Sequence, residues 1–188
     1  ANTNYRNHRK IIIVDGKVGF VGGINLDDRY WNNGKHKLFW RDAAVRIEGP
    51  AVALMQVQFF LSWVFSNGKN NFSSIERYLT PALEKGNAIV SFAASGPGSK
   101  APYIMETILL AIGEAKKSVR ICNPYFIPNE QLTSALVIAA ASGVKVELIL
   151  PAHSDSFFVQ HASFSFIKPL LERGVDVYLY QKGFIHSK

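Results

Sequence analysis

The sequence predicts an α/β protein in which a mixed β-sheet is flanked by helices and the chain supplies parts of two lobes. From about residue 87 onward, short β-branched runs alternate with apolar segments of helical length, the pattern of strands joined by crossover helices. The first 65 residues lack this alternation. We therefore expect a boundary within 66–86, and we assign 1–75 to the first lobe and 76–188 to the second.

The first part of the chain is predicted to open with a β-hairpin over 9–24. Ile11–Val14 is apolar on both faces, as a buried strand is, and the Asp15-Gly16 dipeptide is a turn signal. Three further elements are expected. They are a short strand at 43–47, a long apolar helix at about 51–65 and a loop rich in Asn, Ser and Gly at 66–74. In that helix, Trp63 together with Phe59 and Phe60 favours packing in the core over contact with a bilayer.

The second part is predicted to alternate strands with helices. The strands are expected at 87–94, 118–123, 144–150, 175–180 and 184–188. The helices are expected at 101–117, 131–142 and 157–173. Gly143 and Gly174 directly follow the last two helices, which is a common way for a helix to end. This order predicts a mixed α/β sheet whose strands are joined by crossover helices.

The composition favours an anionic binding partner but does not identify it. The chain of 188 residues is 48% hydrophobic and carries a net charge of +7, with a pI of about 9.5. A basic chain suits an anionic partner, which is nucleic acid, an anionic membrane surface or a phosphorylated substrate. The single cysteine, Cys122, excludes an intrachain disulfide and a multi-cysteine metal site, and we expect it to be buried. The longest apolar stretch, 51–65, is too short to span a bilayer.

Two His-x-Lys pairs lie near opposite ends of the chain. They are His8 with Lys10 and His186 with Lys188. Residues two apart on a strand project from the same face, so each pair places an imidazole beside an ammonium group. Such a pair suits a phosphate, because the lysine supplies fixed charge while the imidazole attacks phosphorus or moves a proton. The alternative for either pair alone is a solvated strand end whose histidine has no special role.

The first pair belongs to a longer pattern. His8, Lys10, Asp15, Gly22 and Asn25 fit the spacing HxK(x)4D(x)6G(x)2N on a predicted strand, turn and strand. This pattern resembles the HKD motif of the phospholipase D superfamily, and the second pair is similar to the opening of a second such motif. The resemblance implies a phospholipase D-like mixed β-sheet flanked by helices.

Segments between the two motifs resemble bacterial cardiolipin synthases in their order. They are Trp40-Arg41-Asp42, Gly49-Pro50-Ala51, Ser95-Gly96-Pro97, Asn123–Pro128 and Gly143-Val144. By this resemblance, 1–75 is the carboxyl-terminal part of the first lobe, and 76–188 is the amino-terminal part of the second. Because the second motif is cut at Lys188, we expect the chain to be a fragment of a longer protein.

The resemblance implies a two-step reaction through a covalent phosphohistidine. His8 is expected to be the nucleophile and His186 the general acid, and the alternative is the reverse order. Lys10, Lys188 and Asn25 are expected to hold the phosphoryl oxygens. No metal and no other cofactor is expected for this chemistry.

Other candidate site residues each have a structural alternative. Asp15 is expected to orient a histidine of the other lobe, and its alternative is a hairpin turn. Gly22 and Gly23 are candidate substrate-binding residues, and their alternative is to permit close backbone approach. Tyr125, at the carboxyl end of a predicted strand, is a candidate for lining an acyl or headgroup channel, with the core as its alternative. The Asp27-Asp28 pair is expected to cap a short helix or lie on the surface rather than bind a metal.

The implied function is phosphatidyl transfer between two phosphatidylglycerol molecules, giving cardiolipin and glycerol. The expected partners are phosphatidylglycerol and an anionic membrane surface, with the catalytic part peripheral to the bacterial cell membrane or facing the cytoplasm. The alternatives are a hydrolytic phospholipase D, in which water resolves the same intermediate, and a superfamily nuclease. Nucleic acid is the less favoured partner, because two motifs in one chain argue against the nuclease. The non-enzymatic alternative is a basic module that binds membranes or nucleic acid.

Overall fold

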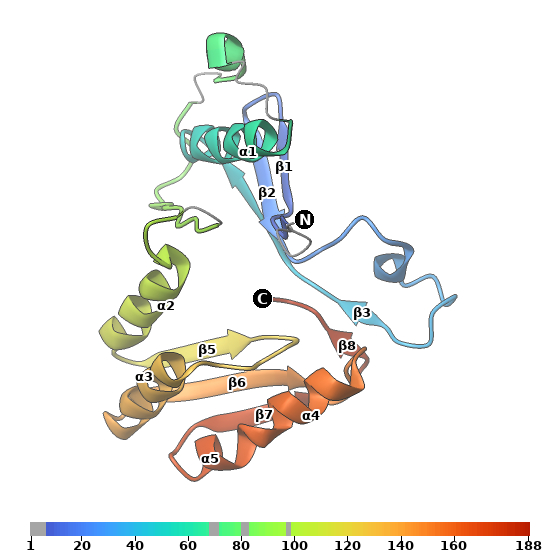
Figure 1. Ribbon diagram of the computed structural model, residues 1–188, viewed down its shortest axis with the longest axis vertical. Helices are drawn as coiled ribbons and strands as arrows, with labels where there is room; N and C mark the ends of the chain where they lie inside the picture. The colour runs from blue at the N-terminus through green and yellow to red at the C-terminus, as the bar shows by residue number, and fades with distance from the viewer. Residues whose placement is uncertain (1–6, 68–71, 80–82, 97–98) are drawn as a thin grey trace. The chain divides into compact units, whose positions relative to one another are not determined.

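The computed structural model describes residues 7–67, 72–79, 83–96 and 99–188 (Figure 1). The chain divides into two compact units, and each is described by itself. The first comprises residues 1–22 and 44–103, and the second comprises residues 23–43 and 104–188. The segment 23–43 therefore belongs with the second half of the chain. The assignment of 1–75 and 76–188 to two lobes of the family fold stays a prediction.

The first unit contains a three-stranded antiparallel sheet in the order β1-β2-β4. The strands are Ile11–Val14, Val18–Gly22 and Ala44–Glu48. The first two form the predicted hairpin, in which Asp15 and Gly16 both have positive φ, as a type I′ turn requires. A hydrogen bond from Lys17 N to Val14 O (3.0 Å) closes this turn.

Helix α1 (Ala51–Asn67) covers one face of this sheet (Figure 1). Val52 and Met55 on its inner side are buried against the strands. Phe59 and Trp63 are 42% and 57% exposed, so the expectation that they pack in the core is wrong. The physical reason is that the sheet covers only one side of a helix that is apolar almost all round.

The second unit is built around a parallel sheet in the order β5-β6-β7. Its strands are Ser118–Cys122, Lys145–Pro151 and Asp176–Tyr180. Helices α2, α3, α4 and α5 span Tyr103–Glu114, Glu130–Ala141, Phe157–Ser165 and Ile167–Leu171. Val146, Leu148 and Leu150 alternate along β6 and are buried in one cluster with Leu136 of α3 and Leu170 of α5. Parallel strands with crossover helices confirm the predicted α/β class.

A separate pair of short parallel strands directly precedes the second His-x-Lys pair. These strands are β3 (Trp40–Arg41) and β8 (Phe184–Ile185). The 3-10 helix η1 (Asp28–Trp31) precedes β3, and Asp27 caps it by accepting a hydrogen bond from Arg29 N at 2.9 Å. The expectation that the acidic pair caps a short helix is confirmed.

Two predicted elements of the middle of the chain differ from the structure. The strand expected at 87–94 is wrong, since residues 83–96 form no strand and Ile89 is 97% exposed. Strand geometry needs a neighbour that pairs with the backbone, and no strand of the described ranges takes that place. The loop expected at 66–74 is also partly wrong, because α1 continues to Asn67 and a 3-10 helix, η2, spans Phe72–Tyr78. Residues 68–71 lie outside the described ranges.

Two elements near the carboxyl end are shorter than predicted. The helix expected at 157–173 is divided into α4 and α5, which end and begin around Phe166. Pro169 explains the division, because it lacks an N–H donor and its ring crowds the carbonyl of Ser165. Of the strand expected at 184–188, only the first two residues form a strand.

Candidate functional site

The second His-x-Lys pair lies at the end of β8, beside β3. His186 N donates a hydrogen bond to Arg41 O at 2.7 Å, which extends the parallel pairing by one step. Gly183 permits this approach, since its φ is +121° and a Cβ there would meet the backbone carbonyl of Phe39. The pairing therefore places His186 next to Asp42, the residue that follows β3.

His186 and Asp42 form a buried pair. The Nδ1 atom of His186 lies 2.7 Å from Oδ2 of Asp42, and the two side chains are 8% and 2% exposed. Because an ionised carboxylate only accepts, the network assigns the proton to Nδ1 and leaves the lone pair on Nε2. Gly23 leaves room for the carboxylate, since a Cβ there would collide with it, and Ala43 N donates to Oδ1 at 2.7 Å. An imidazole held in this way can accept or donate a proton, or attack an electrophile, through Nε2.

Tyr30 makes a further contact with the same nitrogen. Its hydroxyl lies 3.0 Å from His186 Nδ1 and accepts a hydrogen bond from Asn25 Nδ2 at 2.9 Å. Burial raises the pKa of Tyr30 above its ordinary value, and the nearby Asp42 carboxylate adds to the rise. The phenol therefore stays neutral at physiological pH. Together these contacts hold the His186 ring in one orientation.

Aromatic rings surround the imidazole. The ring centroids of Trp40, Phe184 and Tyr125 lie 5.7, 5.9 and 6.1 Å from that of His186. Trp40 and Phe184 are themselves buried, at 7% and 0% exposed. This apolar surround removes water from the imidazole and strengthens its hydrogen bond to the carboxylate.

Lys188 adds positive charge beside the ring. Its Nζ lies 3.2 Å from Nε2 and 3.4 Å from Nδ1 of His186. The nearly equal distances place the ammonium group off the axis of the Nε2 lone pair, which therefore remains available. The spacing of the pair thus brings together an ammonium group and a reactive imidazole nitrogen, which is the juxtaposition that a phosphate requires.

Tyr125 and Asp155 form a hydrogen-bonded pair in the same unit. The Tyr125 hydroxyl donates to Asp155, with both carboxylate oxygens 3.0 Å away. Burial, and after it this hydrogen bond, raises the pKa of Tyr125 above its ordinary value. Because the ring also contacts His186, Tyr125 links the imidazole to an exposed carboxylate.

The first His-x-Lys pair belongs to the first unit and directly precedes β1. His8 is exposed, and Lys10 Nζ donates a hydrogen bond to the carbonyl of His8 at 2.7 Å. Asp15 lies in the hairpin turn at the opposite end of β1, as its structural alternative expects, and its action on a histidine stays a prediction. Gly22 ends β2, where it pairs with Ala44.

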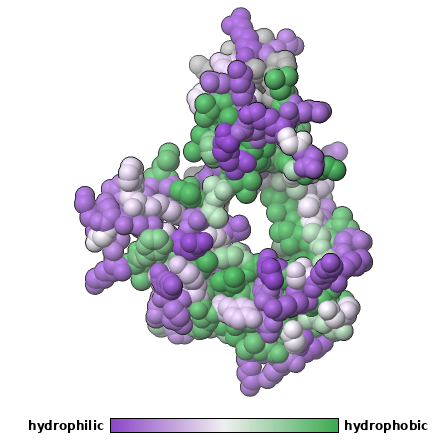
Figure 2. All heavy atoms as spheres, turned by 180° about the vertical axis from the view of Figure 1, so that it is seen from behind, coloured by the Kyte–Doolittle hydropathy of each residue, from purple (hydrophilic) through white to green (hydrophobic). Residues whose placement is uncertain are grey.

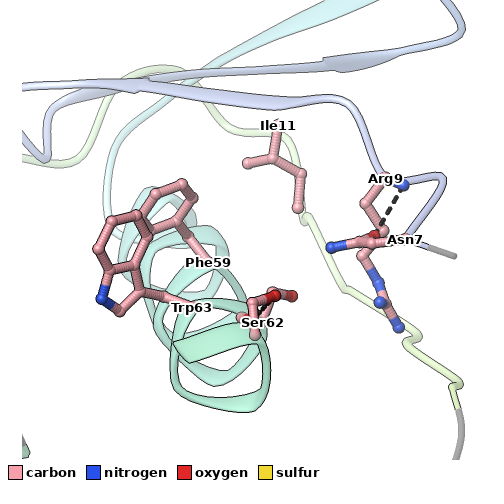
Figure 3. A pocket seen from close by; sticks show the side chains of 7 residues that line it. Asn7, Arg9, Ile11, Phe59, Ser62 and Trp63 are labelled. Carbon is pink, nitrogen blue, oxygen red and sulfur yellow. Dashed lines mark hydrogen bonds between the residues drawn. The ribbon is translucent and has the colours of Figure 1, made fainter. Parts of the chain in front are cut away.

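A pocket of about 410 Å³ lies beside the first pair, between β1 and α1 (Figure 3). Ile11 faces Phe59 and Trp63 of α1, while Arg9 and Asn7 lie on the other side. Arg9 N donates to Asn7 Oδ1 at 3.0 Å, and the Arg9 guanidinium donates to the carbonyl of Ser95. None of the sequence-predicted site residues lines this pocket.

Sequence reasoning missed three residues that contact the second pair or its neighbour, namely Asp42, Tyr30 and Asp155. A carboxylate directly after a short strand, in the Trp40-Arg41-Asp42 segment, is a signal for the first of them. The other two carry no local signal. Tyr30 contacts His186, which lies 156 positions away in the chain. Asp155 contacts Tyr125, which lies 30 positions away.

The described ranges contain neither a cluster of metal-binding groups nor a membrane span. No three His, Cys, Asp or Glu side chains gather there as metal ligands do. No helix there is long and apolar enough to cross a bilayer. Hydrophobic side chains nevertheless reach the surface of both units (Figure 2), among them Trp31, Phe157 and Phe158, which are 78%, 69% and 84% exposed.

Comparison with known proteins finds relatives that share one description. Residues 108–188 match a family described as "Cardiolipin synthase, PLD-like domain". The chain is 43% identical over 187 residues to a cardiolipin synthase of Geobacillus kaustophilus and 44% identical over 187 residues to one of Halalkalibacterium halodurans. Each alignment covers 98% of this chain and 37% of the relative, so the chain spans little more than a third of the length of these curated relatives.

A solved structure supports the fold. The crystal structure of phosphatidylserine synthase from Haemophilus influenzae resembles this chain with a TM-score of 0.62 and 15% sequence identity. The match covers 95% of this chain and 49% of that one. At this identity the likeness concerns the fold alone, and it agrees with the predicted mixed sheet flanked by helices.

Proposed function

We propose that this chain belongs to the phospholipase D superfamily and that the full-length protein containing it is a phosphatidyltransferase. It joins two phosphatidylglycerol molecules to give cardiolipin and glycerol. The observation that carries the proposal is the buried His186–Asp42 pair with Lys188 at the imidazole. The similarity of nearly the whole chain to cardiolipin synthases supports the choice of substrate.

The reaction proceeds in two displacements at phosphorus. In the first, His8 attacks, a P–N bond forms and the P–O bond to glycerol breaks, while His186 gives its proton to the departing alkoxide. In the second, His186 takes the proton of an acceptor hydroxyl, the new P–O bond forms and the P–N bond breaks. The sum is an exchange of one ester for another, so no redox partner is required.

Asp42 makes His186 suitable for both proton transfers. A carboxylate at Nδ1 orients the ring and stabilises the imidazolium that is present before the first proton transfer and forms again in the second. Tyr30 restricts the rotation of the same ring. We therefore assign to Asp42 the role of orienting His186, while the action of Asp15 on a histidine stays a prediction.

Two lysines and an asparagine are assigned to the phosphoryl oxygens. Lys10 and Lys188 supply positive charge to the oxygens as their charge grows in the transition state. Asn25 uses Nδ2 toward Tyr30, and its second amide hydrogen remains for a phosphoryl oxygen. Gly23 has its own role, which is to admit the Asp42 carboxylate.

The proposed partners are phosphatidylglycerol and the anionic surface of the bacterial membrane, with the catalytic part peripheral or facing the cytoplasm. The net charge of +7 supports attraction to such a surface. Exposed aromatic side chains such as Phe157 and Phe158 are suited to the interfacial region of a bilayer.

A lipid-product assay tests the proposal. The full-length protein is incubated with phosphatidylglycerol in mixed micelles, and mass spectrometry follows cardiolipin, phosphatidic acid and glycerol. We expect equimolar cardiolipin and glycerol from the wild type and neither product from His186→Ala or His8→Ala. Phosphatidic acid without cardiolipin would make the protein a hydrolase instead. No lipid product would overturn the proposal in favour of a nuclease or a binding module.

A further inference from the structure

Asp155 and Tyr125 lie on neighbouring loops at the carboxyl ends of parallel strands. Tyr125 follows β5, and Asp155 follows β6. In α/β sheets, ligands bind at this edge. The Tyr125 ring is edge-on to His186, with an interplanar angle of 75°, and its hydroxyl points on to Asp155. The phenol therefore bridges the reactive imidazole and a carboxylate that no proposed step has used.

Both loops are held in place by their own hydrogen bonds. Tyr125 N donates to Asn123 Oδ1 at 2.8 Å. Gln160 of α4 fastens the second loop, because its Nε2 donates to Ala152 O at 2.7 Å and its Oε1 accepts from Ser154 N at 3.3 Å. The two side chains are therefore presented by a preorganised edge, as a ligand site requires.

Asp155 has acceptor capacity that its protein contacts do not fill. The carboxylate is exposed and shares the one phenolic hydrogen of Tyr125 between its two oxygens, with Ser154 Oγ at 3.4 Å from one of them. An ionised carboxylate accepts about four hydrogen bonds, so positions remain for donors from a ligand. The nearby Arg29 guanidinium donates instead to Asp27, at 2.9 and 3.0 Å, and holds the pKa of that carboxyl at about 2.

The opposite charges of Lys188 and Asp155 determine which ligand groups can bind beside each of them. Lys188, at the imidazole, attracts a phosphate. Asp155 repels a phosphate and favours a hydroxyl group, which donates a hydrogen bond to it. The phenolic oxygen of Tyr125 can accept a second one. The pair thus suits a neutral polyol that lies next to a phosphoryl group.

We infer that Asp155 and Tyr125 form the subsite that binds the non-reacting hydroxyl of the acceptor headgroup. The ligand class is an alcohol with a second, vicinal hydroxyl, as in the glycerol headgroup. This inference rests on the proposed phosphatidyl transfer. One hydroxyl of the diol attacks phosphorus while its neighbour donates to Asp155, so the subsite selects a diol over water and over simple alcohols.

A competition between two alcohols tests the subsite. The full-length protein receives phosphatidylglycerol as donor, with equal amounts of 1,2-propanediol and 1-propanol as acceptors. Both products form from one common intermediate, so their ratio reports only the second displacement. We expect the wild type to favour the diol by about tenfold or more, and Asp155→Asn and Tyr125→Phe to bring the ratio close to one.

Matched control substitutions distinguish a loss of diol selectivity from damage to the fold. Asp176→Asn and Tyr178→Phe remove the same chemical groups from exposed positions on β7, and we expect them to keep the wild-type ratio. If the two loops are only clamped together by this hydrogen bond, Asp155→Asn will lower both products equally. That result, or an unchanged ratio at unchanged rate, would overturn the subsite while leaving phosphatidyl transfer intact. If the wild type phosphatidylates no alcohol and makes no cardiolipin, both proposals fail.

Discussion

At the scale of single residues, the orientation and tautomer of the His186 ring are set by the side chains that contact it. The carboxylate of Asp42 and the hydroxyl of Tyr30 lie 2.7 and 3.0 Å from the same ring nitrogen. Lys188 Nζ lies 3.2 Å from the other ring nitrogen. Hydrogen bonding to Nδ1 thus leaves Nε2 as the nitrogen that is available to a substrate. We expect a change at Asp42 to alter the reaction without altering the fold.

Asp42→Asn is the substitution that isolates this effect. The amide keeps the size of the side chain but can no longer stabilise an imidazolium, so we expect kcat to fall about a thousandfold with KM little changed. The assay is cardiolipin formation by the full-length protein, with circular dichroism as a check on folding. Asp176→Asn, at an exposed position, serves as the control. A loss of less than threefold would show that Asp42 does not act on the reacting imidazole.

The Tyr125–Asp155 hydrogen bond is expected to appear in an alkaline titration. Burial and the carboxylate raise the pKa of Tyr125 above its ordinary value of 10.0. Its contribution to stability is therefore complete below pH 10 and is lost as the pH rises through the folded-state pKa. Near-ultraviolet absorbance of the phenolate, with Tyr125→Phe subtracted, measures that pKa. Asp155→Asn should lower it, and an unchanged value would contradict the hydrogen bond.

At the scale of elements, the site depends on one short pair of strands. β3 and β8 have two residues each, yet they carry Asp42 and His186 to adjacent positions. Gly183 is the residue that lets β8 approach, because its φ of +121° is strained for any other residue. The stability of this pairing is therefore expected to be sensitive to a single methyl group.

Gly183→Ala tests that sensitivity. The added Cβ would meet the Phe39 carbonyl, and we expect a loss of about 1–3 kcal/mol in the free energy of unfolding, together with loss of activity. Denaturant unfolding of the full-length protein measures the first quantity. Gly113→Ala in α2 is the control, since its Cβ would meet nothing within 4 Å and should stabilise the helix by about 0.5–1 kcal/mol. Equal effects of the two substitutions would refute the account of β8.

Elements with a strong local pattern could be predicted from the sequence, and those that depend on partners could not. The Asp15-Gly16 turn and the alternation along β6 are local, and both are confirmed. The strand expected at 87–94 is wrong because pairing is a property of neighbours and not of propensity alone. The division of the last long helix followed from Pro169, a local signal that the helical periodicity outweighed in the prediction.

At the scale of the whole molecule, the sequence pattern predicts the basic residues of the candidate site but gives no sign of its acidic partner. His186 and Lys188 are recognisable because their spacing is short and repeats that of His8 and Lys10. Asp42 is 144 residues from its partner in the chain, and only the parallel pairing of β3 with β8 brings them together. Long-range pairing of this kind leaves no periodicity in the sequence.

The net charge of +7 predicts electrostatic binding to anionic membranes. Lys35 and Lys37 are exposed on a loop that Asn32 closes by bonding both backbone groups of Trp40, at 2.7 and 2.8 Å. We expect the double substitution of these lysines by Glu to weaken binding of the full-length protein to phosphatidylglycerol vesicles by about tenfold or more. Added salt should weaken wild-type binding in the same assay.

Lys116 and Lys117 provide the control for membrane binding. They precede β5, at the end of the parallel sheet opposite to the loop that carries Tyr125. Their substitution by Glu changes the net charge by the same amount, and we expect it to leave vesicle binding within about threefold of the wild type. If both double variants bind equally weakly, the attraction is a property of the total charge and not of the loop.

The central claim is that phosphatidyl transfer passes through a covalent bond to histidine. The most direct measurement is peptide mass spectrometry of the full-length protein, quenched within a single turnover of phosphatidylglycerol. We predict an acid-labile phosphatidyl adduct on the peptide that contains His8, absent from His8→Ala and formed more slowly in His186→Ala. Rapid cardiolipin formation by the wild type with no adduct on any histidine would contradict the account.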